Sequence, residues 1–444
     1  MPTNSSQPAR GTRDFLPPDV RRREYVIGIV RDVYARYGFE PLETPAFENI
    51  ETLTGKYGEE GNRLIFKILK RGEHESTGEA DLALRYDLTV PLARVVAQYQ
   101  NELPRFFKRY QIQPVWRADR PARGRFREFF QCDLDTVGTT SPLVEAEQMA
   151  AVGEIMTRLG FEDFTIRVNH RAILSLLLTK ATLPPSQHAD ALVALDKLDK
   201  IGRDGVSREL ADKGISEHGR DTLLNWIGAG PRPDRLDWLE RELDAAEHPA
   251  FLNLRQILDL AGRTPAGARL RFDPSLARGL SYYTGAIMEI AVPDLAGSLG
   301  GGGRYDNLIG MFLGRDLPAC GFSLGLERVI VVMMERQMFP ERVVRGGLDM
   351  MVTIWSHDRR EESLALAAEL RNAGLRVELY PEADKLGKQF KYASARQVPF
   401  VAIVGDDERA RGEVAVKDMR SGEQVAVSRA DAAAFIKGKV RSDS

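Results

Sequence analysis

The stretch RYQIQPVWRADRPARGRFREFFQCDLD, residues 109–135, sets the pattern for the whole chain. It joins two runs rich in aromatic and β-branched residues, 105–117 and 126–138, through a short polar loop. Two such runs around a loop that contains glycine are typical of paired antiparallel strands. The stretch therefore predicts a long β-hairpin.

The loop of this hairpin is rich in arginine and in aromatic residues. Guanidinium groups are planar and permanently charged, which suits them to phosphate oxygens, and an exposed ring can stack on a base. The hairpin is therefore a candidate clamp for a polyphosphate, although a solvated basic loop would have the same composition. The residues are Arg117, Arg120, Arg123, Arg125 and Arg127, with Phe126 among them and Phe129 and Phe130 shortly after them.

Three other motifs each allow two interpretations. In RYDLT, 85–89, Asp87 could accept an ammonium group or cap the helix expected after it. Four consecutive glycines in GSLGGGGRYDNLIG, 297–310, would let a ligand approach the backbone or would form a flexible hairpin tip. In GFSLGLERVIVV, 321–332, Arg328 falls on the first turn of an expected helix, as a phosphate ligand or a surface residue. The same segment matches GxSxG, but the only later histidine is His357, which disfavours a serine hydrolase.

The segment RGLSYYTGAIMEI, 278–290, alternates between apolar and other residues. Alternation predicts a β-strand that begins with Arg278, with Tyr282 and Tyr283 on opposite faces. A strand that starts with a guanidinium and two phenols is typical of a strand that borders a ligand-binding site.

The order of patterns along the chain predicts more than one domain. Residues from about 176 to 262 are helical in pattern and interrupt a strand-rich region, as an inserted module would. Beyond 340–347, short apolar runs alternate with helical segments, which predicts a separate α/β domain over 347–444. Its expected helix 384–397 carries Lys385, Lys388 and Arg396 on one side, with Lys391 nearby, as phosphate contacts or as a solvated face.

Composition excludes several classes of protein. With 62 Lys and Arg against 64 Asp and Glu, the net charge of −2 argues against non-specific coating of nucleic acid. The two cysteines, Cys132 and Cys320, exclude a disulfide framework and a cysteine-rich zinc site. No P-loop, no strand–GxGxxG–helix and no HExxH is present, so we name no metal ligands. No signal peptide or apolar run of membrane-spanning length occurs, so we expect a soluble, cytoplasmic protein without a membrane partner.

Taken together and in this order, the motifs resemble those of the histidyl-tRNA synthetase family, a class II aminoacyl-tRNA synthetase family. YGFEPLETPAFE, 37–48, is similar to class II motif 1 and ends near the dimer-interface proline, Pro45. The opening hairpin resembles motif 2, GFSLGLERVI resembles motif 3, and RGLSYYTG is similar to a stretch specific to the histidyl enzymes. DKLDK, GGGGRYDNL and RYDLTVPLAR also match, and the C-terminal segment LGKQFKYASARQVPFVAIVG resembles the family's anticodon-binding domain.

The resemblance implies an α+β fold: an antiparallel catalytic sheet over 1–340 that carries the helical insertion, followed by the anticodon-binding domain. It implies a homodimer that joins ATP and L-histidine into histidyl-adenylate and then charges tRNA-His. ATP would be a substrate accompanied by Mg²⁺, with no tightly bound cofactor. The insertion would clamp the tRNA acceptor arm, or would serve only for packing.

The resemblance also implies roles for individual residues. Arg117 and Arg278 would be catalytic and would contact the α-phosphate from two sides. The nucleotide would further meet Asp119, Arg125, Phe129 and Arg328. The histidine pocket would comprise Asp87, Leu88, Thr89, Gln131, Asp135, Tyr282, Tyr283 and Tyr305, beside Arg117 and Arg278.

One residue departs from the family pattern, because Ser281 stands where an aspartate is usual. Two non-catalytic alternatives remain: the synthetase-like regulatory subunit of ATP phosphoribosyltransferase, and a module that senses uncharged tRNA. The presence of Arg117, Arg278, Arg328 and the C-terminal domain disfavours both.

Overall fold

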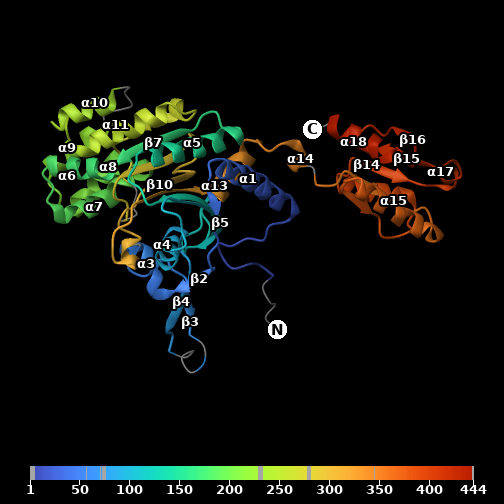
Figure 1. Cartoon of the computed structure of the whole chain (residues 1–444), viewed down its shortest axis with the longest axis horizontal. Helices are drawn as coiled ribbons and strands as arrows, with labels where there is room; N and C mark the ends of the chain where they lie inside the picture. The colour runs from blue at the N-terminus through green and yellow to red at the C-terminus, as the bar shows by residue number, and fades with distance from the viewer. Residues whose placement is uncertain are drawn as a thin grey trace. The chain divides into compact units, whose positions relative to one another are not determined.

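The computed structural model of the chain describes residues 6–56, 58–70, 72, 77–228, 234–277, 282–344 and 346–442 (Figure 1). The chain divides into two compact units. One comprises Met1–Asp14 and Arg23–Met338, and the other comprises Phe15–Arg22 and Phe339–Ser444. Arg278 and Ser281 lie outside the described residues.

The first unit is built on an eight-stranded sheet with the order β1-β5-β6-β11-β10-β9-β7-β8. The six central strands, from β5 to β7, pair antiparallel, and only the short edge strands β1 and β8 pair parallel with their neighbours. The predicted antiparallel sheet is therefore confirmed. The bounds are β1 Glu40–Pro41, β5 Phe107–Trp116, β6 Glu128–Val137, β7 Thr165–His170, β8 Leu270–Phe272, β9 Ala286–Ala291, β10 Gly300–Arg304 and β11 Ala319–Gly325.

The opening stretch forms the hairpin β5–β6, as predicted. Its register places Arg109 opposite Asp135 and Gln111 opposite Asp133. On its other side β6 pairs with β11, so that Ser323 lies opposite Asp133. Since side chains alternate along a strand, Gln131, Asp133 and Asp135 share one face of the sheet while Cys132 and Leu134 share the other.

Three helices cover the Cys132 face of the sheet: α1 (Pro17–Arg36), α5 (Leu143–Arg158) and α13 (Leu326–Glu335). In α1 the residues Val26, Val30 and Val33 recur at helical spacing and are buried, which gives the helix an apolar stripe toward the core. The Tyr34 hydroxyl of α1 donates to the Cys132 carbonyl at 2.9 Å. The Gln148 amide of α5 donates to the Cys320 carbonyl at 2.8 Å, so both helices are also hydrogen-bonded to the strands they cover.

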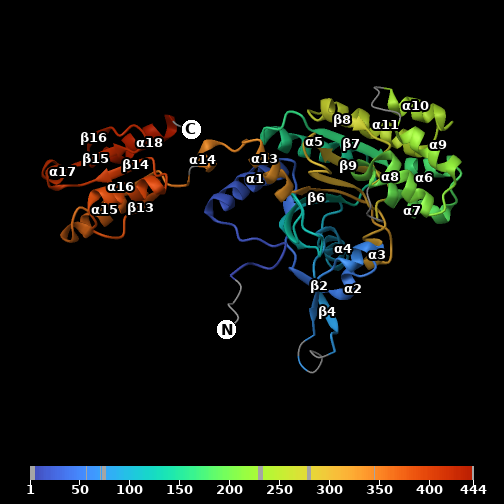
Figure 2. The same cartoon turned by 180° about the vertical axis from the view of Figure 1, so that it is seen from behind.

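Six helices lie between β7 and β8 in the sequence and form one group in space (Figures 1 and 2). In α8 the backbone leaves helical geometry at Gly202, where φ is 68°. A smaller sheet with the order β2-β4-β3 lies elsewhere in the unit, beside α2 (Ile50–Leu53), α3 (Gly58–Arg63) and α4 (Thr89–Gln98). The six helices are α6 Arg171–Lys180, α7 Pro185–Leu195, α8 Leu198–Asp212, α9 Glu217–Gly228, α10 Arg235–Glu242 and α11 Pro249–Gly262. The strands of the smaller sheet are β2 Phe47–Asn49, β3 Lys67–Leu69 and β4 Ala80–Leu84.

The second unit is an α/β domain around a five-stranded sheet with the order β13-β12-β14-β15-β16. Strands β13, β12 and β14 are parallel, and β15 and β16 continue the sheet antiparallel. The strands are β12 Met350–Val352, β13 Val377–Leu379, β14 Phe400–Ile403, β15 Glu413–Asp418 and β16 Gln424–Ser428. The helices include α15 Arg360–Asn372, α16 Leu386–Ala395, α17 Asp406–Arg411 and α18 Ala432–Ser442.

The described part of the segment predicted as a strand from residue 278 differs from the expectation. Residues 282–285 are not part of a regular strand, and β9 begins at Ala286. Tyr282 and Tyr283 line a pocket. For the glycine run the hairpin-tip alternative is wrong, since residues 300–303 belong to strand β10, and Gly300 and Gly301 line the pocket described below.

None of the described helices is both long and apolar enough to cross a membrane. Cys132 and Cys320 are both buried free thiols.

Candidate active site

A pocket of about 450 Å³ opens on the Gln131 face of the large sheet. It gathers side chains from distant parts of the sequence, and most of the residues expected at the site line it. Leu88 and Pro45 do not line it, and Arg278 lies outside the described residues. The expected residues in the lining are Asp87, Thr89, Arg117, Asp119, Arg125, Phe129, Gln131, Asp135, Tyr282, Tyr283, Tyr305 and Arg328.

One end of the pocket holds two buried carboxylates beside one buried arginine. Arg109 of β5 is fully buried, and its Nη2 lies 2.8 Å from Asp135 Oδ2 and 3.9 Å from Asp133 Oδ2. The Tyr305 hydroxyl donates to Asp135 Oδ1. Asp133 is 1% exposed and lines the same pocket. Our sequence analysis missed Asp133, although its alternation with Gln131 and Asp135 would have placed it on the pocket face.

Burial governs the ionisation of this end of the pocket. Removal from water raises the pKa of Asp133 to about 7, and it also raises the pKa of Asp135, although Arg109 opposes both shifts. Burial likewise raises the pKa of the Tyr282 and Tyr305 hydroxyls well above the ordinary value, so both remain neutral donors. This end of the pocket therefore presents buried acids, and among the described residues Arg109 is the cation that lies against Asp133 and Asp135.

The buried acceptor atoms without a hydrogen-bond partner in this end include Asp133 Oδ1 and Gln131 Oε1, whereas Asp135 Oδ2, also without a hydrogen bond, lies 2.8 Å from Arg109 Nη2. The other atom of the Gln131 amide, Nε2, donates to Ser323 Oγ at 2.8 Å. Buried acceptors without a donor are costly, so this end of the pocket suits a ligand that brings N–H groups.

Another part of the lining, which we call the arginine end, comprises Arg117, Arg125 and Arg328. The Arg117 guanidinium lies over the Tyr86 ring at 4.3 Å and the Phe129 ring at 5.2 Å, and its Nε donates to the Tyr86 carbonyl. Arg125 donates to Asp119 Oδ1 at 2.9 Å, and Arg328 donates to the Ser298 carbonyl.

The remaining hairpin arginines do not line the pocket. Arg123 donates to Glu335, Arg127 donates to the Asp119 carbonyl, and Arg120 is exposed. Phe126 lines the pocket beneath Arg13, whereas Phe130 lies outside it. The expected clamp therefore reduces to Arg117 and Arg125 of the hairpin.

Two adjacent tyrosines reach the same pocket. The rings of Tyr282 and Tyr283 are 5.0 Å apart, and Tyr282 lies 6.0 Å from the Tyr305 ring in an edge-on arrangement. The expectation that they take opposite faces of a strand is therefore wrong. Outside the regular strand, both phenols can address one ligand.

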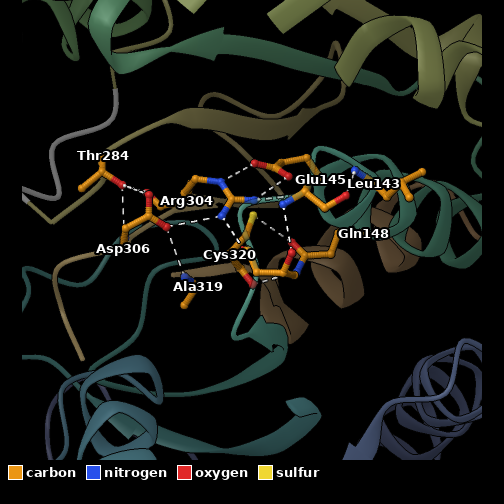
Figure 3. Close-up of polar contacts among 10 residues, drawn as sticks. Leu143, Glu145, Gln148, Thr284, Arg304, Asp306, Ala319 and Cys320 are labelled. Carbon is orange, nitrogen blue, oxygen red and sulfur yellow. Dashed lines mark hydrogen bonds and ion pairs between the residues drawn. The ribbon is translucent and has the colours of Figure 1, made fainter. Parts of the chain in front are cut away.

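A buried polar network supports this wall of the pocket (Figure 3). Arg304, directly before Tyr305, donates through Nε and Nη2 to both carboxylate oxygens of Glu145 at 2.7 and 2.8 Å. The Arg304 carbonyl accepts from the Thr284 backbone, directly after Tyr283. Asp306 completes the link, because its carboxylate accepts from the Thr284 hydroxyl and the Ala319 amide. The network thus joins the segment that carries Tyr283 to the segment that carries Tyr305.

Glycine makes room for the carboxylates. A Cβ atom on Gly321 of β11 would lie 1.8 Å from Asp135 Oδ1, far inside contact distance. A Cβ on Gly302 would lie 2.0 Å from the Gly321 carbonyl oxygen. The glycine-rich strands therefore let polar side chains and backbone approach each other closely.

The alternative interpretations can now be judged. Ser323 of the GxSxG match lies within β11 and accepts from Gln131, so it has a structural partner in place of a catalytic base. Asp87 does cap the helix after it, since its Oδ1 accepts from the Val90 amide at 3.0 Å, and it lines the pocket as well. Among the described residues, no group of three His, Cys, Asp or Glu is placed to hold a metal ion.

Comparison with known proteins agrees with this arrangement. A family model described as histidyl-tRNA synthetase matches residues 11–329, and one described as an anticodon binding domain matches residues 349–439. The chain is 43% identical to the histidine–tRNA ligase of Flavobacterium johnsoniae, over 94% of the chain and 96% of the relative. It is also 43% identical to the histidine–tRNA ligase of Porphyromonas gingivalis, over 96% and 98%.

Solved structures give the same result for the fold. The histidyl-tRNA synthetase of Nostoc sp. PCC 7120 has a TM-score of 0.83 at 32% identity and covers 98% of this chain and 100% of its own. A Bacillus halodurans protein described as an ATP phosphoribosyltransferase regulatory subunit/histidyl-tRNA synthetase has a TM-score of 0.74 at 21% identity, over 89% and 97%. At that identity the second likeness concerns the fold alone.

Proposed function

Because the chain belongs to the histidyl-tRNA synthetase family and acts as a histidine–tRNA ligase, we propose that the pocket on its large sheet joins L-histidine to ATP. The observation that carries this proposal is that one pocket is lined both by the buried acids of β6 and by Arg117, Arg125 and Arg328. An amino acid brings an ammonium group and ATP brings phosphates, so each substrate finds complementary charge. The relatives' names over nearly full length favour the ligase over a regulatory subunit.

Histidine occupies the acidic end in this proposal. The ammonium group meets Asp87, Thr89 and Gln131, and the Leu88 backbone belongs to the same turn. The imidazole lies against Asp135, whose orientation is fixed by Arg109 and the Tyr305 hydroxyl. Asp135 can accept from a ring N–H, and a phenol from Tyr282 or Tyr283 can address the second nitrogen.

The nucleotide occupies the arginine end. Adenine stacks on Phe129 beside Asp119, and the phosphates meet Arg117, Arg125 and Arg328. Arg125 donates to Asp119 Oδ1, so binding of a phosphate to Arg125 would replace that carboxylate as its partner. The residue proposed to face Arg117 across the α-phosphate is Arg278.

The reaction requires positioning and charge stabilisation. A histidine carboxylate oxygen attacks the α-phosphorus of ATP, the new O–P bond forms, and pyrophosphate leaves. The carboxylate is already ionised, so no general base is needed. Negative charge builds on the phosphorus oxygens, and fixed guanidinium groups stabilise it. Mg²⁺ would arrive with the phosphates, and among the described residues no group of three His, Cys, Asp or Glu is placed to hold it.

We further assign residues 1–340 to catalysis and 347–444 to anticodon binding, with the helical insertion at about 176–262 gripping the tRNA acceptor arm. Lys385, Lys388 and Arg396 would meet tRNA phosphates. Two of them would give up surface partners, since Lys388 lies 2.8 Å from Asp384 and Arg396 lies 3.4 Å from Glu378. We also propose a homodimer through the segment around Pro45, which is exposed beside the half-exposed Phe47, and a cytoplasmic location.

The decisive experiment is histidine-dependent exchange of pyrophosphate into ATP by the purified protein, followed by charging of tRNA-His. We expect both activities. Absence of exchange with histidine, under conditions where ATP binds, would contradict the proposal. Exchange without charging would confine the error to the tRNA assignments.

A further inference from the structure

Asp133 occupies the centre of the acidic end and has no role in the reaction so far. It lies on β6 between Gln131 and Asp135, on the same face, and is 1% exposed. The register of the sheet places it between Gln111 of β5 and Ser323 of β11. It is therefore a buried acid that faces the substrate pocket.

The charges around Asp133 do not balance. Arg109 is the nearest cation, and it lies 2.8 Å from Asp135 but 3.9 Å from Asp133. Its nitrogens also donate to Gln111 Oε1 and to the Leu88 carbonyl, which holds it on the Asp135 side. Since a buried ionised carboxylate requires a partner, Asp133 in its charged form needs a second cation, and none of the described residues other than Arg109 forms an ion pair with it.

The free acceptor atoms show what that cation must carry. Asp133 Oδ1 and Gln131 Oε1 both lack a hydrogen-bond partner, and both side chains bond to the Ser323 hydroxyl. An ammonium group supplies one positive charge and three N–H donors. We propose that Asp133 is a further substrate-binding residue, whose carboxylate and the Gln131 carbonyl receive the α-ammonium group of histidine. This inference rests on the proposed function.

The pH dependence of binding follows from the groups that face Asp133. Arg109 favours its ionised form, the carboxylates of Asp135 and Asp87 oppose it, and Ser323 donates to it. The net effect raises the pKa of Asp133 to about 7 in the empty pocket. Because an ammonium group binds the ionised form, affinity should increase with pH up to about 7 and then level off.

Two ligands separate the ammonium group from the imidazole: histidinol, and its deamino analogue 3-(imidazol-4-yl)propan-1-ol. Each is measured as a competitive inhibitor of histidine in pyrophosphate exchange. Asp133→Asn should weaken histidinol about 10- to 100-fold, the size of a lost charge-assisted hydrogen bond, and leave the deamino analogue within about twofold. The KM for ATP should not change.

The matched control is Thr136→Val, because Thr136 is a buried β6 residue whose hydroxyl lacks a partner but which does not line the pocket. It should affect neither inhibitor. The difference in log Ki for histidinol between wild type and Asp133→Asn should increase with pH up to about 7. Histidinol itself titrates equally in both measurements, so its own titration cancels in this difference.

Equal weakening of both inhibitors would overturn the proposal, because a general distortion does not distinguish them. Unchanged histidinol binding would overturn it too, while leaving the ligase assignment intact if wild-type exchange is normal. If Asp133→Asn does not fold, calorimetry on the wild type at pH 6.5 replaces it. Histidinol should then release more protons than the deamino analogue, and equal release would refute the role of Asp133.

Discussion

Replacing Asp133 with asparagine should stabilise the empty protein, and increasingly so as the pH rises. The folded protein holds the pKa of Asp133 at about 7, against about 3.9 for an unfolded chain. The neutral form therefore supports the fold fully below about pH 4, and this support is lost as the pH rises through 7. Asparagine resembles the neutral form and does not titrate.

The magnitude follows from the same difference in pKa. At about 1.36 kcal/mol per pH unit, the stability gap between variant and wild type should widen by about 2 kcal/mol between pH 5.5 and 7. It should then stay constant, at about 4 kcal/mol in total. Removing one charge also eases the ionisation of Asp135, which acts in the same direction because the two carboxylates share Arg109.

Differential scanning calorimetry of both proteins at pH 5.5 and pH 8 is the appropriate assay. For a unit of this size, 2 kcal/mol corresponds to about 3 °C in the midpoint of unfolding. A gap that does not change with pH would refute the reasoning, and so would a variant less stable than wild type at pH 8. Saturating histidinol should reverse the order, because ligand binding then favours the wild type.

Three further predictions concern the walls of the pocket. Gly321→Ala should lower kcat/KM for histidine about 10²-fold, because the added methyl displaces Asp135 by about 1 Å; steady-state exchange kinetics measure this, and a near-normal value would contradict the packing. Arg304→Gln should cost about 3–5 kcal/mol in thermal unfolding by stranding the buried Glu145 carboxylate, and adding Glu145→Gln should restore part of it; no recovery would show that the two are not coupled. Arg278→Ala should lower the exchange rate about 10²–10³-fold with an unchanged circular dichroism spectrum, and a rate near that of wild type would exclude a catalytic role.

Local patterns in the sequence predicted the framework of the site. Alternation and turn residues placed the hairpin strands within about two residues of β5 and β6. Helical spacing placed α13 so that Arg328 lies on its first turn. These elements follow from contacts between neighbours in the sequence.

What the sequence could not show depends on distant partners. An arginine in a strand is expected at the surface, yet Arg109 is fully buried because two acids of the paired strand face it. Arg304 and its partner Glu145 are 159 residues apart, so no local pattern relates them. The two adjacent tyrosines share one pocket only because the chain leaves the strand before Ala286, which tertiary packing decides.

The glycines beneath Asp135 limit how this protein could evolve toward another amino acid. The substrate specificity of a pocket often changes when a side chain in its floor becomes larger or smaller. Here any added atom at Gly321 meets the carboxylate that would do the recognising, so that route to a new substrate is closed. Changes of charge along β6 are the alternative route, because Gln131, Asp133 and Asp135 all face the pocket. We therefore expect differences in amino-acid specificity among related proteins to lie in the acidic and amide residues of β6, while the glycines beneath Asp135 stay unchanged.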